Sequence, residues 1–147
     1  MTRYRVSIRQ DLRPAPFRGA KLRALVRKAL ALLDPEAADL RVLVVDDAGI
    51  AKWNREFLGR PRATNVISFP DEDSPGLSGD ILVSAPTCLR QTSAWPGSPE
   101  ERVFYFIVHG ILHLAGYDHE LGAREARRMR AAENELYRSV VERKRDR

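Results

Sequence analysis

All three histidines of the chain lie within eleven residues, in the stretch HGILHLAGYDH from His109 to His119. His109 and His113 are four residues apart, so on a helix their side chains project from one face, side by side. Gly116 follows and can adopt a positive φ at no steric cost, which lets the chain turn sharply and return His119 to the same point. The spacing therefore predicts three imidazoles that converge on one metal ion.

Three neutral nitrogen ligands with one open coordination position are typical of a catalytic zinc site rather than a closed structural one. Imidazole also binds copper, iron and nickel, so zinc is the favoured metal among several. The alternative is a pair of core histidines, but burying two imidazoles together without a metal or polar partners is costly. We expect one Zn²⁺ ion per chain, bound by His109, His113 and His119.

The same spacing occurs in metzincin proteases, whose motif is HExxHxxGxxH. Here Gly110 stands where those proteases carry the glutamate that serves as the general base. Peptide hydrolysis would lose its main proton acceptor, whereas a metal can activate water by itself when the substrate is a phosphodiester. We therefore expect a water activated by the metal as the nucleophile, and the sequence identifies no catalytic side chain.

Asp118 is the one weak candidate for a catalytic role, because it precedes the last predicted ligand. Its carboxylate could orient an imidazole or act as a weak base. A turn or capping role after Gly116 is the simpler interpretation. Asp80 follows Gly79 at a predicted strand start, where a structural role at a turn or sheet edge is favoured over catalysis.

Hydrophobic periodicity predicts the elements that position these residues. The helix carrying the histidines is apolar on nearly every side from Val103 to Leu114, so we expect it to be buried. A capping box formed by Ser98 and Glu101 should start it. Strands are expected at Tyr4–Ile8, Leu40–Val45, Val66–Phe69 and Ile81–Ser84. Further helices are expected at Phe17–Leu33 and Ala123–Arg143. Another should run from an N-cap at Asp46 or Asp47 to Gly59, and a short one should follow Pro86.

This order of elements predicts the α+β class, with a small mixed β-sheet packed with helices. Strand order cannot be derived from it. The acidic, turn-rich segment DEDSPGLSGD, residues 71–80, is expected to be an exposed loop. The 147 residues suffice for a single domain, 1–147, with its own core.

Charge and composition narrow the class of protein. The net charge of +5 fits either a preference for polyanions or an ordinary solvated surface, and charge alone does not decide between them. The single cysteine, Cys88, cannot form an internal disulfide, which fits a reducing cytoplasm. The start has no apolar signal segment, and the longest apolar stretch, Val103–Val108, is too short to cross a bilayer.

The histidine motif closely resembles the HGxLHLxGYDH signature of the YbeY family, bacterial rRNA maturation factors described as metal-dependent, single-strand-specific endoribonucleases. WNREFLGRPRATNVISFP, residues 53–70, is similar to the family segment LNxxYRxxxxPT(D/N)VLSFP. Gly79-Asp80-Ile81 matches the family's GDI. The resemblance covers about residues 53–119, and it implies a zincin-like metal-dependent hydrolase fold with the three histidines as ligands.

The resemblance also implies an endoribonuclease that acts in rRNA maturation, notably 3′ processing of small-subunit rRNA, and in ribosome quality control. Single-stranded RNA, ribosomal RNA and the small ribosomal subunit are the implied partners, with no membrane, in the cytoplasm. The oligomeric state stays open.

Two positions depart from the family pattern: Leu58 stands where the family usually has an arginine, and Ala63 where it has a proline. That arginine is regarded in the family as important for RNA cleavage. Arg60 and Arg62 are candidates for RNA contact that could supply the charge, although both also fit a solvated loop. Two alternatives therefore stay open: a non-catalytic ribosome-biogenesis factor stabilised by metal, and a metallopeptidase with an unidentified base.

Overall fold

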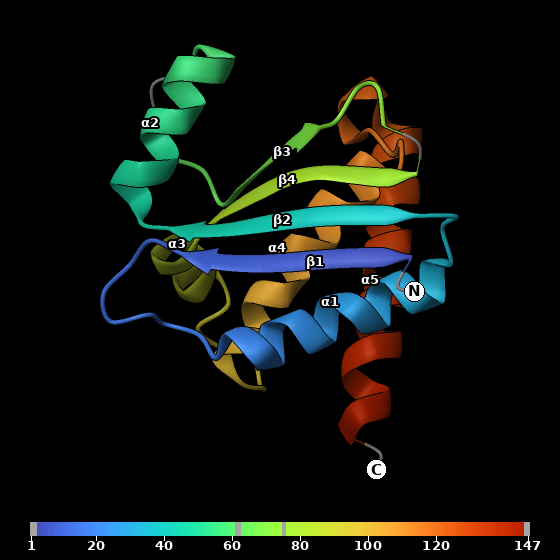
Figure 1. Ribbon diagram of the computed structural model, residues 1–147, viewed down its shortest axis with the longest axis horizontal. Coiled ribbons are helices and arrows are strands. Elements are labelled where there is room, and N and C mark those ends of the chain that lie inside the picture. Colours follow the sequence, from blue (N-terminus) through green and yellow to red (C-terminus); the bar gives the residue numbers. More distant parts are fainter. Residues whose placement is uncertain (1–2, 61–62, 75, 146–147) are drawn as a thin grey trace.

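The computed structural model describes residues 3–60, 63–74 and 76–145, without the side chains of His119 and of residues 143–145. Within this part, four strands form one sheet, with five helices and a short 3₁₀ turn around it (Figure 1). The strands are β1 (Tyr4–Gln10), β2 (Ala38–Val45), β3 (Val66–Pro70) and β4 (Leu77–Ser84). The helices are α1 (Gly19–Leu33), α2 (Asp47–Leu58), α3 (Ala85–Gln91), α4 (Pro99–Leu114) and α5 (Ala123–Arg145), with η1 (His119–Leu121) between the last two.

The sheet has the order β1-β2-β4-β3. β1, β2 and β4 run parallel, and β3 pairs antiparallel with β4 at one edge. The prediction of a mixed sheet packed with helices is thus confirmed. The strand order comes from two crossover connections that carry α1 and α2, and such long-range pairing leaves no local trace in a sequence.

The expectation that residues 71–80 form an exposed loop is wrong for their last four residues. β4 begins at Leu77, and Leu77, Ser78 and Gly79 are buried. The strand pairs with β2 on one side and β3 on the other, so its backbone groups have partners that outweigh the turn-forming composition. Gly79 fits because a Cβ there would approach the Phe69 carbonyl oxygen to 2.5 Å.

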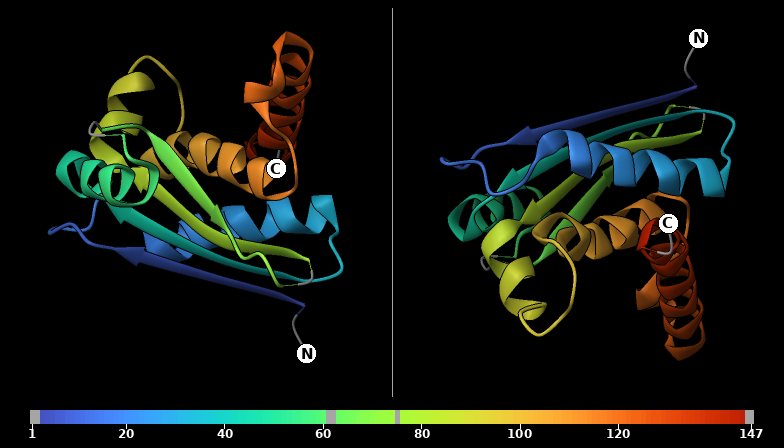
Figure 2. Two further views of the ribbon diagram at one scale, coloured as in Figure 1. Left: turned by 90° about the horizontal axis from the view of Figure 1, so that it is seen from above. Right: turned by 90° about the horizontal axis from the view of Figure 1, so that it is seen from below.

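Three helices lie on one face of the sheet in two layers. α1 and α4 pack directly on this face, and α5 lies on the far side of α4 from the strands (Figure 2). The resulting core includes Val42, Val44, Ile81 and Val83 from the strands, all nearly inaccessible to solvent. The expected burial of the histidine helix is therefore confirmed. None of the helices in the described residues is long and apolar enough to cross a membrane.

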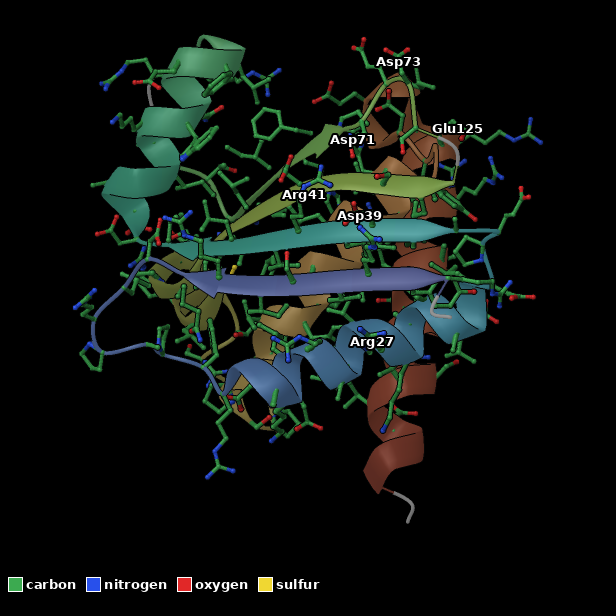
Figure 3. The ribbon with its side chains drawn as sticks, viewed as in Figure 1. Arg27, Asp39, Arg41, Asp71, Asp73 and Glu125 are labelled. Atoms are coloured by element: carbon green, nitrogen blue, oxygen red, sulfur yellow. The ribbon has the colours of Figure 1, made fainter. Side chains whose placement is uncertain are left out.

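The opposite face of the sheet carries a smaller apolar cluster and a polar network. Val45, Ile50, Ile67 and Leu82 form the cluster, which joins α2 to the strands. Beside it on β2, the Arg41 guanidinium donates to Asp71 at 2.7 Å and to Asp80 at 2.9 Å, on the face of the sheet opposite α1 and α4 (Figure 3). Asp80 has a structural role, but the expected position at a turn or sheet edge is wrong, because Asp80 lies inside β4, which pairs with β2 on one side and β3 on the other.

Candidate metal centre

His109 and His113 lie one turn apart on α4, half-buried, and both line a cavity of about 370 Å³. We call these two side chains the histidine wall. α4 begins as the sequence predicts: Ser98 Oγ accepts from the Glu101 amide, and the Glu101 carboxylate accepts from the Ser98 amide at 2.9 Å. A capped, buried helix holds the two imidazoles on a rigid support.

Gly110 faces the sheet and not the cavity. A Cβ at this position would lie 2.8 Å from Ile81 Cγ2 and 3.0 Å from Ser68 Oγ. Because the helix packs this closely on β3 and β4, no side chain fits after His109, and the glutamate of the protease motif has no room. The glycine is thus explained by close packing of the helix on the strands.

The chain turns at the end of α4 as the motif predicts. Gly116 has a φ of +106°, and the Tyr117 amide donates to the Leu112 carbonyl at 3.1 Å. η1 then begins at His119, whose side chain lies outside the described residues. Glu120, the next residue, lines the same cavity as the histidine wall. The turn therefore returns the backbone to the cavity, and the role of His119 as a third ligand stays a prediction.

Asp118 caps this turn. Its Oδ1 accepts a hydrogen bond of 2.9 Å from the Glu120 amide, as the N-cap of η1. It does not line the cavity, whereas Glu120 does. The geometry fits the turn role that the sequence favoured for Asp118.

A glutamate from α5 contacts the histidine wall on the side away from the cavity. Glu133 is only 6% exposed, and its carboxylate bonds to Nδ1 of His109 and accepts from the Tyr105 hydroxyl at 3.2 Å. Glu133 was not among the site residues predicted from the sequence. A signal was present, because Glu133 stands four residues after Met129 and three before Leu136, on the stripe that α5 buries.

His113 provides the observation that tests whether a metal fits here. Its Nδ1 is buried and has no hydrogen-bond partner among the described residues. A buried ring nitrogen without a protein partner is costly in an ordinary core, and it fits a side chain whose partner is a ligand. Apart from the undescribed side chains, no three His, Cys, Asp or Glu side chains gather around one point. Two imidazoles on one cavity fit a zinc ion.

The wall opposite the histidines comes from the end of α2 and the segment leading into β3. α2 ends at Leu58, its C-cap Gly59 has a φ of +67°, and the Arg60 amide donates to the Asn54 carbonyl at 3.2 Å. This C-cap turns Arg60 toward the cavity, which it lines. We call Leu58, Arg60, Thr64 and Asn65 the loop wall. The other candidate for RNA contact, Arg62, lies outside the described residues.

A second cavity of about 350 Å³ continues from the first past the loop wall. The two share Asn54, Arg60, Thr64 and Asn65, and the second is bounded further on by Thr87 and Gln91 of α3. The Asn65 amide donates to Gln91 Oε1 at 3.1 Å, which joins the loop wall to α3. Together the cavities form a polar groove that starts at the histidines and reaches α3.

Comparison with known proteins gives one consistent result. The family model described as Endoribonuclease YbeY matches residues 9–141. A protein named Endoribonuclease YbeY from Geobacter metallireducens is 37% identical over 146 residues, covering 95% of this chain and 97% of the relative. One of the same name from Syntrophotalea carbinolica is 43% identical over 112 residues, covering 71% and 75%.

A solved structure has the same fold. The solution structure of TM1509 from Thermotoga maritima is 26% identical to this chain and superposes with a TM-score of 0.67. The match covers 96% of this chain and 92% of that one. The arrangement of strands and helices is therefore shared over nearly the whole length.

Proposed function

This chain belongs to the YbeY family of endoribonucleases, and on that premise we propose that it hydrolyses phosphodiester bonds of single-stranded RNA at the histidine wall. The observation that carries the proposal is the cavity shared by His109 and His113, with a His113 ring nitrogen that has no hydrogen-bond partner in the part of the chain that the structure describes. The relatives matching most of the chain are named endoribonucleases, which supports the reaction class.

We propose that His109, His113 and His119 hold one Zn²⁺ ion. Imidazole nitrogens suit zinc, and the position of Glu120 on the cavity supports the return of the neighbouring His119 to the same place. When bound, the ion would supply Lewis acidity for the phosphoryl group and make water a better nucleophile at neutral pH. The residues of the chain fix the place where that chemistry occurs, because α4 is buried and capped.

The loop wall holds the RNA backbone in this proposal. Arg60 lies on both cavities, so its guanidinium can bind a phosphate on either side of the bond that is cleaved. Asn65 and Gln91 offer amide groups along the groove, suited to the edges of unpaired bases. A single strand can place successive nucleotides in the two cavities, whereas paired bases would first have to separate.

Gly110 and Glu133 argue against the metallopeptidase alternative. The position of the protease glutamate has no space for a side chain, and Glu133 bonds to His109 without lining the cavity. A peptide-bond reaction would thus lack its usual base. The non-catalytic alternative is favoured by one observation only, the leucine at position 58 of the loop wall.

The biological substrate follows from family membership. We propose that the chain acts on ribosomal RNA, in 3′ maturation of the small-subunit rRNA and in ribosome quality control, together with the small subunit in the cytoplasm. Residues 1–147 would act as one YbeY-like domain, since the family model spans 9–141.

Metal analysis combined with RNA cleavage tests this proposal. Purified protein should carry close to one Zn²⁺ per chain and cleave a single-stranded RNA oligonucleotide, while sparing the same sequence in a duplex. His109→Ala should lose both the metal and the cleavage. A wild-type protein that binds zinc but leaves single-stranded RNA intact would overturn the proposed activity in favour of the non-catalytic factor. Cleavage of an unfolded polypeptide instead would favour the peptidase.

A further inference from the structure

Both oxygens of the Glu133 carboxylate bond to side chains of α4. One oxygen bonds to Nδ1 of His109, and the other accepts from the Tyr105 hydroxyl. Burial, and next the charge of Glu133, raise the pKa of Tyr105, so its hydroxyl stays protonated and donates. The carboxylate is thereby fixed in orientation as well as in position.

The Glu133 carboxylate contacts His109 on the side of the imidazole that faces away from the cavity, and the Tyr105 hydroxyl contacts that carboxylate. Glu133 does not line the cavity and is 6% exposed, so it is out of reach of a bound substrate. An imidazole that donates its Nδ1 proton to a carboxylate carries its lone pair on Nε2. A histidine with that lone pair fixed is prepared to bind a metal, and a carboxylate partner makes its nitrogen more basic.

A glutamate is also an unusual choice for this place in the core. Its neighbours on the buried stripe of α5 are Met129 and Leu136, and an apolar side chain would avoid the cost of burying a carboxylate. Proteins commonly keep a buried charged residue, despite this cost, where the residue supports a functional site.

We propose that Glu133 is a positioning residue that sets the tautomer and the ring orientation of His109 and so the zinc affinity of the site. The inference rests on the metal site of the proposed function and adds a residue of the last helix to it. Glu133 acts through His109 and takes no part in proton transfer to or from RNA.

Zinc affinity, measured by competition with a chromogenic chelator, tests the proposal without RNA. Glu133→Leu keeps the side-chain volume close and removes the acceptor, so its affinity should fall about 10–100-fold, as for other partners of metal-bound histidines. Glu133→Gln should lose less zinc affinity than Glu133→Leu, because the amide oxygen can still accept a hydrogen bond from Nδ1 of His109. A Glu133→Leu protein that is folded and binds zinc within about twofold of wild type would overturn the proposal.

Two control variants separate this role from a loss of stability. Glu100 is equally buried, 6% exposed, and accepts from the Arg18 amide at 2.8 Å at the other end of α4. Glu100→Gln should lower the melting temperature and leave zinc affinity unchanged. Glu135→Gln, on the exposed face of α5, should change neither. Equal losses of zinc affinity in Glu100→Gln and Glu133→Gln would overturn the proposal, as an effect of stability alone.

The tautomer gives a readout in the metal-free protein. Nitrogen-15 NMR of the imidazoles should show His109 protonated on Nδ1 in wild type and shifted toward the Nε2-protonated form in Glu133→Leu. If Glu133→Leu does not fold, the same comparison is made with Glu133→Met, whose side chain likewise offers no oxygen acceptor to Nδ1. An unchanged His109 tautomer in a folded Glu133→Leu protein would contradict the proposal. Zinc binding without RNA cleavage would refute the proposed activity and leave the role of Glu133 intact.

Discussion

The two walls of the cavity differ in how firmly the fold holds them. The histidine wall stands on α4, between the sheet and α5, and its neighbours Val108, Ile111 and Leu112 are almost fully buried. The loop wall comes from a helix end and a connecting segment, with Leu58 47% exposed and Arg60 also exposed. A change in the histidine wall should disturb both chemistry and core, whereas the loop wall can vary while the fold stays intact.

The largest effect should follow His113→Ala. It removes a predicted ligand, so cleavage of single-stranded RNA should fall by about 10³-fold, equivalent to about 4 kcal/mol of lost charge stabilisation. Zinc at 100 times its Kd should stabilise wild type by about 2.7 kcal/mol and this variant hardly at all. Thermal melts with and without zinc measure the difference. A variant that keeps the zinc-dependent shift would exclude His113 as a ligand.

Gly110→Ala should strain the contact between the histidine wall and the sheet. The added Cβ would press on Ile81 and Ser68, and overpacking of this kind costs about 1–3 kcal/mol, partly offset by the better helix propensity of alanine. We expect a melting temperature lower by roughly 3–8 °C. Gly19→Ala is the matched control, since a Cβ there meets nothing within 4 Å. Equal melting temperatures for the two variants would contradict the close-packing explanation.

Leu58→Arg tests whether the loop wall limits catalysis. It restores the residue that the family usually has and places a cation on the cavity. Cleavage should rise about tenfold, which corresponds to about 1.4 kcal/mol of added transition-state stabilisation. This is less than a well-placed hydrogen-bond donor contributes. Zinc content and melting temperature should not change, because the side chain is exposed. No gain in kcat/KM, with RNA binding unaltered, would show that position 58 is not limiting.

Arg60→Ala should weaken RNA binding by a smaller amount. Losing one phosphate contact should raise KM a few-fold and reduce the slope of log affinity against log salt by about one. Arg55→Ala on α2 is the control, since Arg55 does not line the cavity. Zinc affinity should be unchanged in both variants. The same salt slope in wild type and Arg60→Ala would remove Arg60 from the RNA path.

The smallest effect concerns the anchor of α2, which carries the loop wall. Hydrogen bonds from Ser84 and Thr87, and then Arg90, hold the pKa of Asp47 below its usual range. A lowered pKa stabilises the fold above the ordinary aspartate pKa, and the contribution is lost as the pH falls through the lowered value. The difference in melting temperature between wild type and Asp47→Asn should therefore shrink in acid, whereas Glu56→Gln should match wild type throughout.

The histidine wall was largely predictable because its signals are local. The His-x3-His spacing, the Ser98–Glu101 capping box and the turn at Gly116 each involve neighbours in sequence, and the structure confirms the helix, its cap and its turn. Helix and strand boundaries differ by a few residues, as at β4, where pairing with two strands extends the element to Leu77.

The unpredicted parts depend on contacts between distant segments. Glu133 reaches His109 from a different helix, and Gly110 is required by a side chain of β4. Arg60 and Arg62 were equivalent in the sequence, and only the C-cap at Gly59 places Arg60 on the cavity. The ligand role of His119 and any role of Arg62 stay predictions.

The hydrogen bond between His109 and Glu133 joins residues 24 positions apart, and the later one belongs to the last helix. A nascent polypeptide emerges from its N-terminus and begins to fold before its end is made. While α5 is still inside the exit tunnel, the imidazole motif is already outside but lacks the carboxylate behind it. His109 therefore gains the partner that orients its ring only after α5 has emerged and packed on α4.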